Sequence, residues 1–86
     1  MHQVYVIESA SGQRYVGLSD DPARRLRQHN AGQSRWTQRG AGTWRIIWSS
    51  EMLTLSNARK LENRLKCQGR GSGFYSITGI PRPGGS

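Results

Sequence analysis

The sequence contains little cysteine, few acidic residues and no long apolar stretch. Cys67 is its only cysteine, so the chain can close no internal disulfide, and one thiol alone cannot build a structural zinc site. No apolar run approaches the ~20 residues of a membrane-spanning helix. No charged start, apolar stretch and small-residue cleavage site marks the chain for secretion. These absences argue against a transmembrane protein and predict a cytoplasmic, reducing setting.

The shortage of acidic residues leaves the chain strongly basic. Five Asp and Glu residues stand against 13 Lys and Arg, which gives a net charge of +8, and 11 of the 13 bases are Arg. Such a charge predicts an acidic partner, and nucleic acid comes first because each neutralised phosphate releases counterions. Guanidinium groups suit phosphate because they bind it with two parallel hydrogen bonds. An anionic membrane usually requires a basic amphipathic helix with a large apolar face, and none is evident.

Large aliphatic residues are also scarce, since only 15 of the 86 residues are Leu, Ile, Val or Phe. Three Trp and three Tyr add apolar mass, and the apolar residues recur with clear periodicity. We therefore expect one folded domain over residues 1–80 with a thin core and modest stability, followed by a flexible tail over residues 81–86.

Two β-rich runs, Gln3–Ile7 and Arg14–Leu18, are joined by a Ser- and Gly-containing stretch over residues 9–12. This pattern predicts an antiparallel hairpin. Tyr5 and Tyr15 lie in the middle of the two strands, where their hydroxyls could emerge on one side of the sheet. Aromatic cross-strand pairs are also ordinary strand chemistry, so the tyrosines alone do not indicate a function.

The rest of the chain predicts two helices and a third strand. We expect a helix over Ala23–His29 started by Asp20 or Asp21 with Pro22, a basic loop over Gln33–Gly42 with room for one helical turn, a strand over Trp44–Ser49, and a helix from Thr54 or Ser56 to about Lys66. The apolar stripe of the last helix consists of Leu55, Ala58, Leu61 and Leu65. In the glycine-rich tail, a short element could form from Phe74, Tyr75, Ile77 and Ile80. The order indicates an α+β fold in which helices flank a small three-stranded mixed or antiparallel sheet.

Glu62 borders the apolar stripe of the second predicted helix, four residues after Ala58 and three before Leu65. It is the only carboxylate after Glu51. A lone acid beside the core of a basic protein could bind a metal cation. The same spacing equally allows a simple helix salt bridge to Lys66.

Arg25 and His29 are four residues apart and share a face of the first predicted helix. Arg can neutralise phosphate oxygens, and His can donate a hydrogen bond or a proton. The alternative is a solvated basic face that also includes Arg24 and Arg27.

Four segments in the right order resemble the GIY-YIG nuclease superfamily, over about residues 3–66. They are Val4-Tyr5-Val6-Ile7, Tyr15-Val16-Gly17, the helix around Arg24–Asn30 and the helix over Ala58–Lys66. The chain is similar to a small, single-domain member of that superfamily. It departs from the pattern at Gln3, where the family has Gly, and in lacking an Asn after Asn63.

The resemblance implies a divalent-metal-dependent endonuclease that hydrolyses DNA phosphodiester bonds, with a role in DNA repair or recombination. Glu62 would hold one Mg²⁺ or Mn²⁺ ion, and Tyr5 would be the general base. Tyr15 would orient the proton network, and Arg25 would hold the scissile phosphate. His29 would hydrogen-bond Tyr5 or the phosphate, or relay a proton, while Gly17 would allow close backbone approach, so these six residues form the predicted site. Because the reference pKa of tyrosine is ~10, the cations beside Tyr5 are expected to favour its ionised form.

Trp36 lies between Arg35 and Arg39 and could stack an unpaired base. This favours single-stranded, branched or structured DNA as the substrate. Further contacts to the nucleic acid are predicted from Arg24, Arg27, Lys60, Arg64 and Lys66. Two other interpretations stay open, namely a non-catalytic basic nucleic-acid-binding module and a protein-interaction domain on the same scaffold.

Overall fold

A computed structural model describes residues 1–68 and 77–79. Its elements are strand β1 (Gln3–Glu8), strand β2 (Arg14–Ser19), helix α1 (Pro22–Asn30), the 3₁₀ helix η1 (Arg35–Gly40), strand β3 (Arg45–Ser49) and helix α2 (Leu55–Gln68). The predicted α+β fold is confirmed, and the helical turn foreseen in the basic loop is η1. None of the helices in the described part of the chain is long and apolar enough to cross a membrane.

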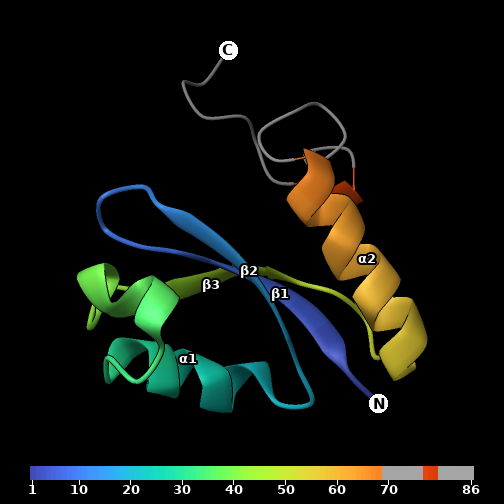
Figure 1. Ribbon diagram of the computed structural model, residues 1–86, viewed down its shortest axis with the longest axis horizontal. Coiled ribbons are helices and arrows are strands. Elements are labelled where there is room, and N and C mark those ends of the chain that lie inside the picture. The colour runs from blue at the N-terminus through green and yellow to red at the C-terminus, as the bar shows by residue number, and fades with distance from the viewer. Residues whose placement is uncertain (69–76, 80–86) are drawn as a thin grey trace.

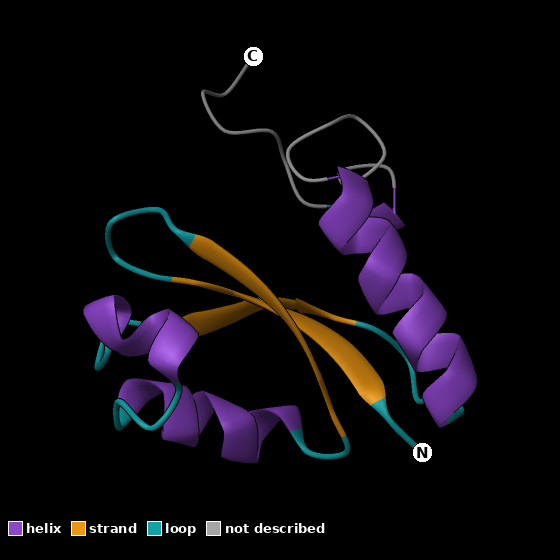
Figure 2. Cartoon of the chain, viewed as in Figure 1, coloured by secondary structure: helices purple, strands orange, loops and turns teal. Residues whose placement is uncertain are grey.

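The sheet is antiparallel throughout and has the order β2-β1-β3, so β2 is an edge strand (Figure 2). β1 is the hydrophobic centre, because Val4, Val6 and Ile7 are fully buried and Tyr5 is 1% exposed. In the hairpin register, Tyr5 lies opposite Gly17. Burial of both faces of β1 explains why it is a nearly continuous apolar run.

The side chains of β1 alternate between two cores, which lie on the two faces of the sheet. Tyr5 and Ile7 pack with Trp44, and Leu26 of α1 packs against them. Val4 and Val6 pack with residues of α2. Figure 1 shows α1 and α2 on opposite sides of the sheet. The domain is therefore built in three layers, with the sheet between α1–η1 and α2.

Local side-chain chemistry sets the helix ends. Asp21 caps α1, since its carboxylate accepts a hydrogen bond from the backbone N–H of Arg24 at 3.2 Å, and Pro22 follows as the first helical residue. Asp20 instead pairs with the Arg24 guanidinium at 2.6 Å. The hydroxyl of Thr54 accepts from the N–H of Asn57 at 3.2 Å and caps α2.

The predicted apolar stripe of α2 is wrong at its first position. Leu55 is 41% exposed, because it opens the helix one turn before Ala58, the first buried residue of α2. From the predicted tail element, Ile77 packs against the core on the α2 side. The other members of that element, Phe74, Tyr75 and Ile80, lie outside the described residues, as does the tail over 81–86.

Candidate active site

Gly17 provides the space in which the phenol ring of Tyr5 lies. A Cβ atom added at Gly17 would sit 2.3 Å from both Cζ and the hydroxyl oxygen of Tyr5. The ring of Tyr5 therefore crosses directly over the backbone of β2, and its hydroxyl reaches toward the edge of the sheet. Any larger residue at this position would displace the phenol.

The hydroxyl of Tyr5 is hydrogen-bonded to Nε2 of His29 at 2.9 Å. His29 is the fully buried residue of α1, so its imidazole forms hydrogen bonds to protein groups instead of to water. The ring of Tyr15 meets the imidazole edge-on, with 5.1 Å between the ring centroids. The hairpin and α1 thus bring Tyr5, Tyr15 and His29 into one cluster.

The other imidazole nitrogen has a partner that the sequence pattern did not single out. Nδ1 of His29 lies 2.7 Å from the hydroxyl oxygen of Thr37 in η1, and Thr37 is only 1% exposed. A threonine within a polar, basic segment resembles its solvated neighbours in sequence. The only sequence feature that could have indicated the contact is that Thr37 follows His29 by eight residues, across the Gly-containing turn that ends α1.

A hydrogen-bonded frame behind the imidazole holds η1 against α1 and β3. The backbone carbonyl of Thr37 accepts from the indole Nε1–H of Trp44 at 2.8 Å. The side chain of Asn30 accepts from the backbone N–H of Trp44 at 2.8 Å and donates to its carbonyl at 3.0 Å. Gly40 lets the indole approach, because a Cβ there would lie 2.6 Å from Nε1. These contacts fix the position of Thr37 relative to His29.

Burial keeps the two groups of the Tyr5–His29 pair neutral. Desolvation raises the pKa of the Tyr5 hydroxyl above its ordinary value, the nearby Arg25 guanidinium opposes this rise, and the charges of Tyr15 and Glu62 add to it. Desolvation also lowers the pKa of His29, and the positive charge of Arg25 lowers it further. The sequence predicted that neighbouring cations would ionise Tyr5, but burial outweighs the effect of Arg25 here.

Arg25 and Glu62 act on the pKa of Tyr5 from opposite layers of the fold. Arg25 is half-buried on α1, where its Nη1 donates to the side-chain oxygen of Gln28 at 2.6 Å, and its charge acts on both Tyr5 and His29. Glu62 lies on α2, and its charge acts on Tyr5. The sequence pattern could not show that both charges act on Tyr5, because the two helices are on different faces of the sheet (Figure 1).

The two interpretations of Glu62 are compatible in the structure. Its side chain is 18% exposed and pairs with Lys66 at 3.4 Å through one of its two oxygens. Such a pair one helical turn apart contributes only about 0.3–0.5 kcal/mol, so it is readily exchanged for a cation. No group of three or more His, Cys, Asp and Glu gathers among the described residues. A single carboxylate fits Mg²⁺ or Mn²⁺, since Mg²⁺ keeps several waters and takes other ligands from substrate phosphates.

The remaining predicted contact residues lie mostly on the surface. Those with exposed side chains are Arg24, Arg27, Arg35, Arg39, Lys60, Arg64 and Lys66. Arg24 is paired with Asp20 and Lys66 with Glu62. The backbone of Trp36 belongs to η1, but its side chain lies outside the part that the structure describes, and so does its predicted stacking role.

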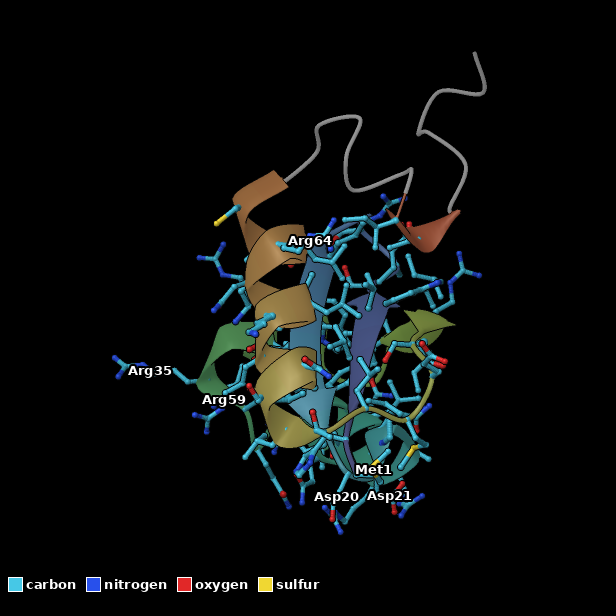
Figure 3. The ribbon with its side chains drawn as sticks, turned by 90° about the vertical axis from the view of Figure 1, so that its right-hand side faces the viewer. Met1, Asp20, Asp21, Arg35, Arg59 and Arg64 are labelled. Carbon is cyan, nitrogen blue, oxygen red and sulfur yellow. The ribbon has the colours of Figure 1, made fainter. Side chains whose placement is uncertain are left out.

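One basic surface on α2 contains Lys60, which the sequence pattern predicted as a contact residue, and Arg59, which it did not. An open pocket of about 410 Å³ on α2 is lined by Leu55, Ser56, Arg59, Lys60 and Asn63. Figure 3 shows Arg59 of α2 and Arg35 of η1 extending to the same side of the molecule. Positive charge from both outer layers therefore reaches that side.

The chain is similar to proteins of Aeromonas and Yersinia. A 40% identical relative over 67 residues is a UPF0213 protein of Aeromonas hydrophila, covering 78% of this chain and 49% of the relative. A UPF0213 protein of Yersinia pestis is 41% identical over 63 residues, covering 73% of this chain and 66% of the relative. The chain thus spans about half the length of the Aeromonas protein it matches. No solved structure gives a significant match. The family profile described as the GIY-YIG catalytic domain matches residues 1–73, and the chain therefore belongs to the GIY-YIG family.

Proposed function

We propose that this domain is a divalent-metal-dependent endonuclease that hydrolyses phosphodiester bonds in DNA. The observation that carries the proposal is the hydrogen bond between the buried Tyr5 hydroxyl and His29 at 2.9 Å. That pair lies within the electrostatic reach of both Arg25 and Glu62. A pure nucleic-acid-binding surface requires neither a buried phenol–imidazole pair nor a carboxylate near phosphate.

Tyr5 and His29 can activate water without first forming a buried phenolate. The phenol oxygen accepts a proton from the attacking water while the phenol proton passes to Nε2 of His29. The water oxygen forms a bond to phosphorus as the bond from phosphorus to the leaving sugar oxygen breaks, and that oxygen takes a proton from solvent. Because the phenol receives one proton as it gives up another, the raised pKa of Tyr5 is no obstacle.

Arg25 and Glu62 supply opposite kinds of help in this scheme. Arg25 offsets the negative charge of the scissile phosphate. This charge increases on the phosphate oxygens as the water attacks. Glu62 holds the divalent cation, which when bound would neutralise phosphate charge and acidify a coordinated water. Tyr15 packs against the imidazole in a T-shaped pair and keeps it oriented toward Tyr5.

The substrate in this proposal is single-stranded, branched or structured DNA. The exposed arginines lie on both outer layers of the fold, on α1 and η1 at one side of the sheet and on α2 at the other (Figure 1), so strands that diverge can each meet positive charge. Phosphate contacts of this kind carry no base information, so they recognise shape and charge rather than sequence.

The test compares cleavage of labelled single-stranded, duplex and branched DNA with and without Mn²⁺. The variant is Glu62→Gln, which keeps the shape of the side chain but removes its charge. Glu51→Gln is the matched control, because Glu51 is exposed in the loop before α2. We expect metal-dependent cleavage by the wild type and Glu51→Gln, and a loss of about 100-fold or more in Glu62→Gln.

Two results would contradict the proposal. Full activity of Glu62→Gln would remove the metal role from that carboxylate. Salt-sensitive DNA binding with no cleavage of any substrate in Mg²⁺ or Mn²⁺ would instead identify a non-catalytic binding module.

A further inference from the structure

Thr37 stands out because a fully enclosed hydroxyl faces the side of His29 that is turned away from Tyr5. Its oxygen is 2.7 Å from Nδ1 of His29, and its side chain has almost no contact with solvent, since the residue is 1% exposed. A buried threonine that serves only packing has no need of so short a contact to a ring nitrogen. The chemistry of the imidazole explains what this contact can do.

A neutral imidazole carries one proton, and the position of that proton decides what the Tyr5–His29 pair can do. With the proton on Nδ1, the bare Nε2 accepts the hydrogen bond from the Tyr5 hydroxyl and can receive its proton. With the proton on Nε2, the imidazole donates to Tyr5 and cannot accept anything from it. Only the first tautomer allows His29 to take up the phenol proton.

The surroundings of Thr37 provide what the first tautomer requires. A hydroxyl can either donate or accept, so its own proton needs a place to go. The backbone carbonyl of Ser34 lies 3.5 Å from the Thr37 oxygen and offers an acceptor for that proton. When the hydroxyl proton turns to Ser34, a lone pair of the same oxygen faces Nδ1 of His29 and can accept its proton. The backbone of Thr37 is held as well, by its N–H to Ser34 at 3.2 Å and by the Trp44 indole on its carbonyl.

We propose that Thr37 is a positioning residue whose hydroxyl oxygen accepts the Nδ1–H of His29 and thereby keeps Nε2 unprotonated toward Tyr5. The catalytic consequence rests on the proposed nuclease function, while the tautomer itself does not. During water activation the phenol proton moves to Nε2, and the resulting imidazolium donates Nε2–H to Tyr5 and Nδ1–H to Thr37. Both N–H groups of the buried cation are then satisfied, which lowers the free energy of that state.

The tautomer is measured directly in the free protein. Two-bond ¹H–¹⁵N correlations of ¹⁵N-histidine-labelled protein distinguish Nδ1–H from Nε2–H. The chain contains only two histidines, so the His2→Gln variant assigns the signals of His29. We expect the Nδ1–H form in the wild type and in Thr37→Ser, and a shift toward the Nε2–H form in Thr37→Val. A wild-type spectrum dominated by Nε2–H overturns the proposal without any variant.

Cleavage kinetics test the consequence with Thr43→Val as the matched control. Thr43 also lies close to η1 but is exposed, and its hydroxyl bonds to Gly40 and Ala10 instead of His29. We expect Thr37→Val to lose about tenfold or more in kcat with an unchanged KM, and Thr37→Ser to recover most of it. Thr43→Val should match the wild type.

The pH profile separates this role from simple packing. Tyr5 and Tyr15 face the imidazole from the sheet, and Arg25 faces it from α1. With these groups unchanged, loss of the Thr37 acceptor disfavours the imidazolium, so the acid limb of kcat moves to lower pH in Thr37→Val. A Thr37→Ser variant as inactive as Thr37→Val, with an unshifted limb, overturns the proposal. If the wild type cleaves no DNA, the nuclease proposal fails, and the tautomer spectra alone then decide the role of Thr37.

Discussion

The substitution Gly17→Ala tests whether the close crossing of Tyr5 over β2 organises the site. The added methyl would lie 2.3 Å from the phenol Cζ and hydroxyl, whereas ordinary contacts begin at 3.4 Å. The ring therefore has to retreat by roughly 1 Å or more. It has little room to do so, because Tyr5 is 1% exposed and packs against Ile7 and Trp44.

The energetic effect follows from two separate losses. Overpacking a rigid core typically destabilises by about 1–3 kcal/mol. A shift of roughly 1 Å also breaks the 2.9 Å hydrogen bond to His29, which contributes about 1 kcal/mol. We expect a decrease of about 2–4 kcal/mol in the free energy of unfolding. For a domain of this size, that lowers Tm by roughly 10–30 °C.

The assay is urea unfolding followed by tryptophan fluorescence, together with DNA cleavage at a temperature where the variant is folded. Gly12→Ala is the control, because nothing lies within 4 Å of its added Cβ and only its φ of +86° is unfavourable. It should lose about 1–2 kcal/mol and keep its activity, whereas Gly17→Ala should lose cleavage as well. A Gly17→Ala protein with wild-type stability and activity would refute this reasoning.

Two further predictions concern the frame of the site. The pKa of His29 is held below its ordinary 6.5, so the unfolded chain takes up a proton that the folded chain resists. The free energy of unfolding should therefore be highest above pH 6.5 and decrease as the pH drops below it. In urea titrations, His29→Gln should make this decrease with pH smaller. Asn30→Ala removes two hydrogen bonds to the Trp44 backbone and should reduce stability by about 2–3 kcal/mol in thermal melts followed by circular dichroism. A loss below about 0.5 kcal/mol would show that solvent replaces Asn30 there.

Local sequence chemistry was sufficient for most of the secondary structure. The antiparallel hairpin follows from two β-rich runs around a short Ser/Gly loop, and only the structure gives its register. Asp21, Pro22 and Thr54 give α1 and α2 their starting points because their side chains or ring satisfy requirements of the first turn. The prediction that Leu55 belongs to the buried stripe of α2 was wrong. Helical periodicity indicates which face of a helix is buried, but not how far along the helix the neighbouring layer extends.

The chemistry of the site required the tertiary structure at two positions. Glu62 both pairs with Lys66 and acts on Tyr5, and spacing along one helix shows only the first of these. The role of Thr37 could be recognised only from the packing of η1 against α1. Its contact to His29 depends on the hydrogen bonds that Trp44 makes with Thr37 and Asn30.

The amino-acid sequence by itself determined the order of the elements, the basic surface and the residue types available for phosphate chemistry. These properties depend on neighbours within a few residues and on charge, both of which are readable along a chain. Only the tertiary structure decided that burial keeps Tyr5 and His29 neutral and that Thr37 completes the pair. Desolvation and hydrogen-bond geometry arise where distant segments meet, so no local pattern carries them.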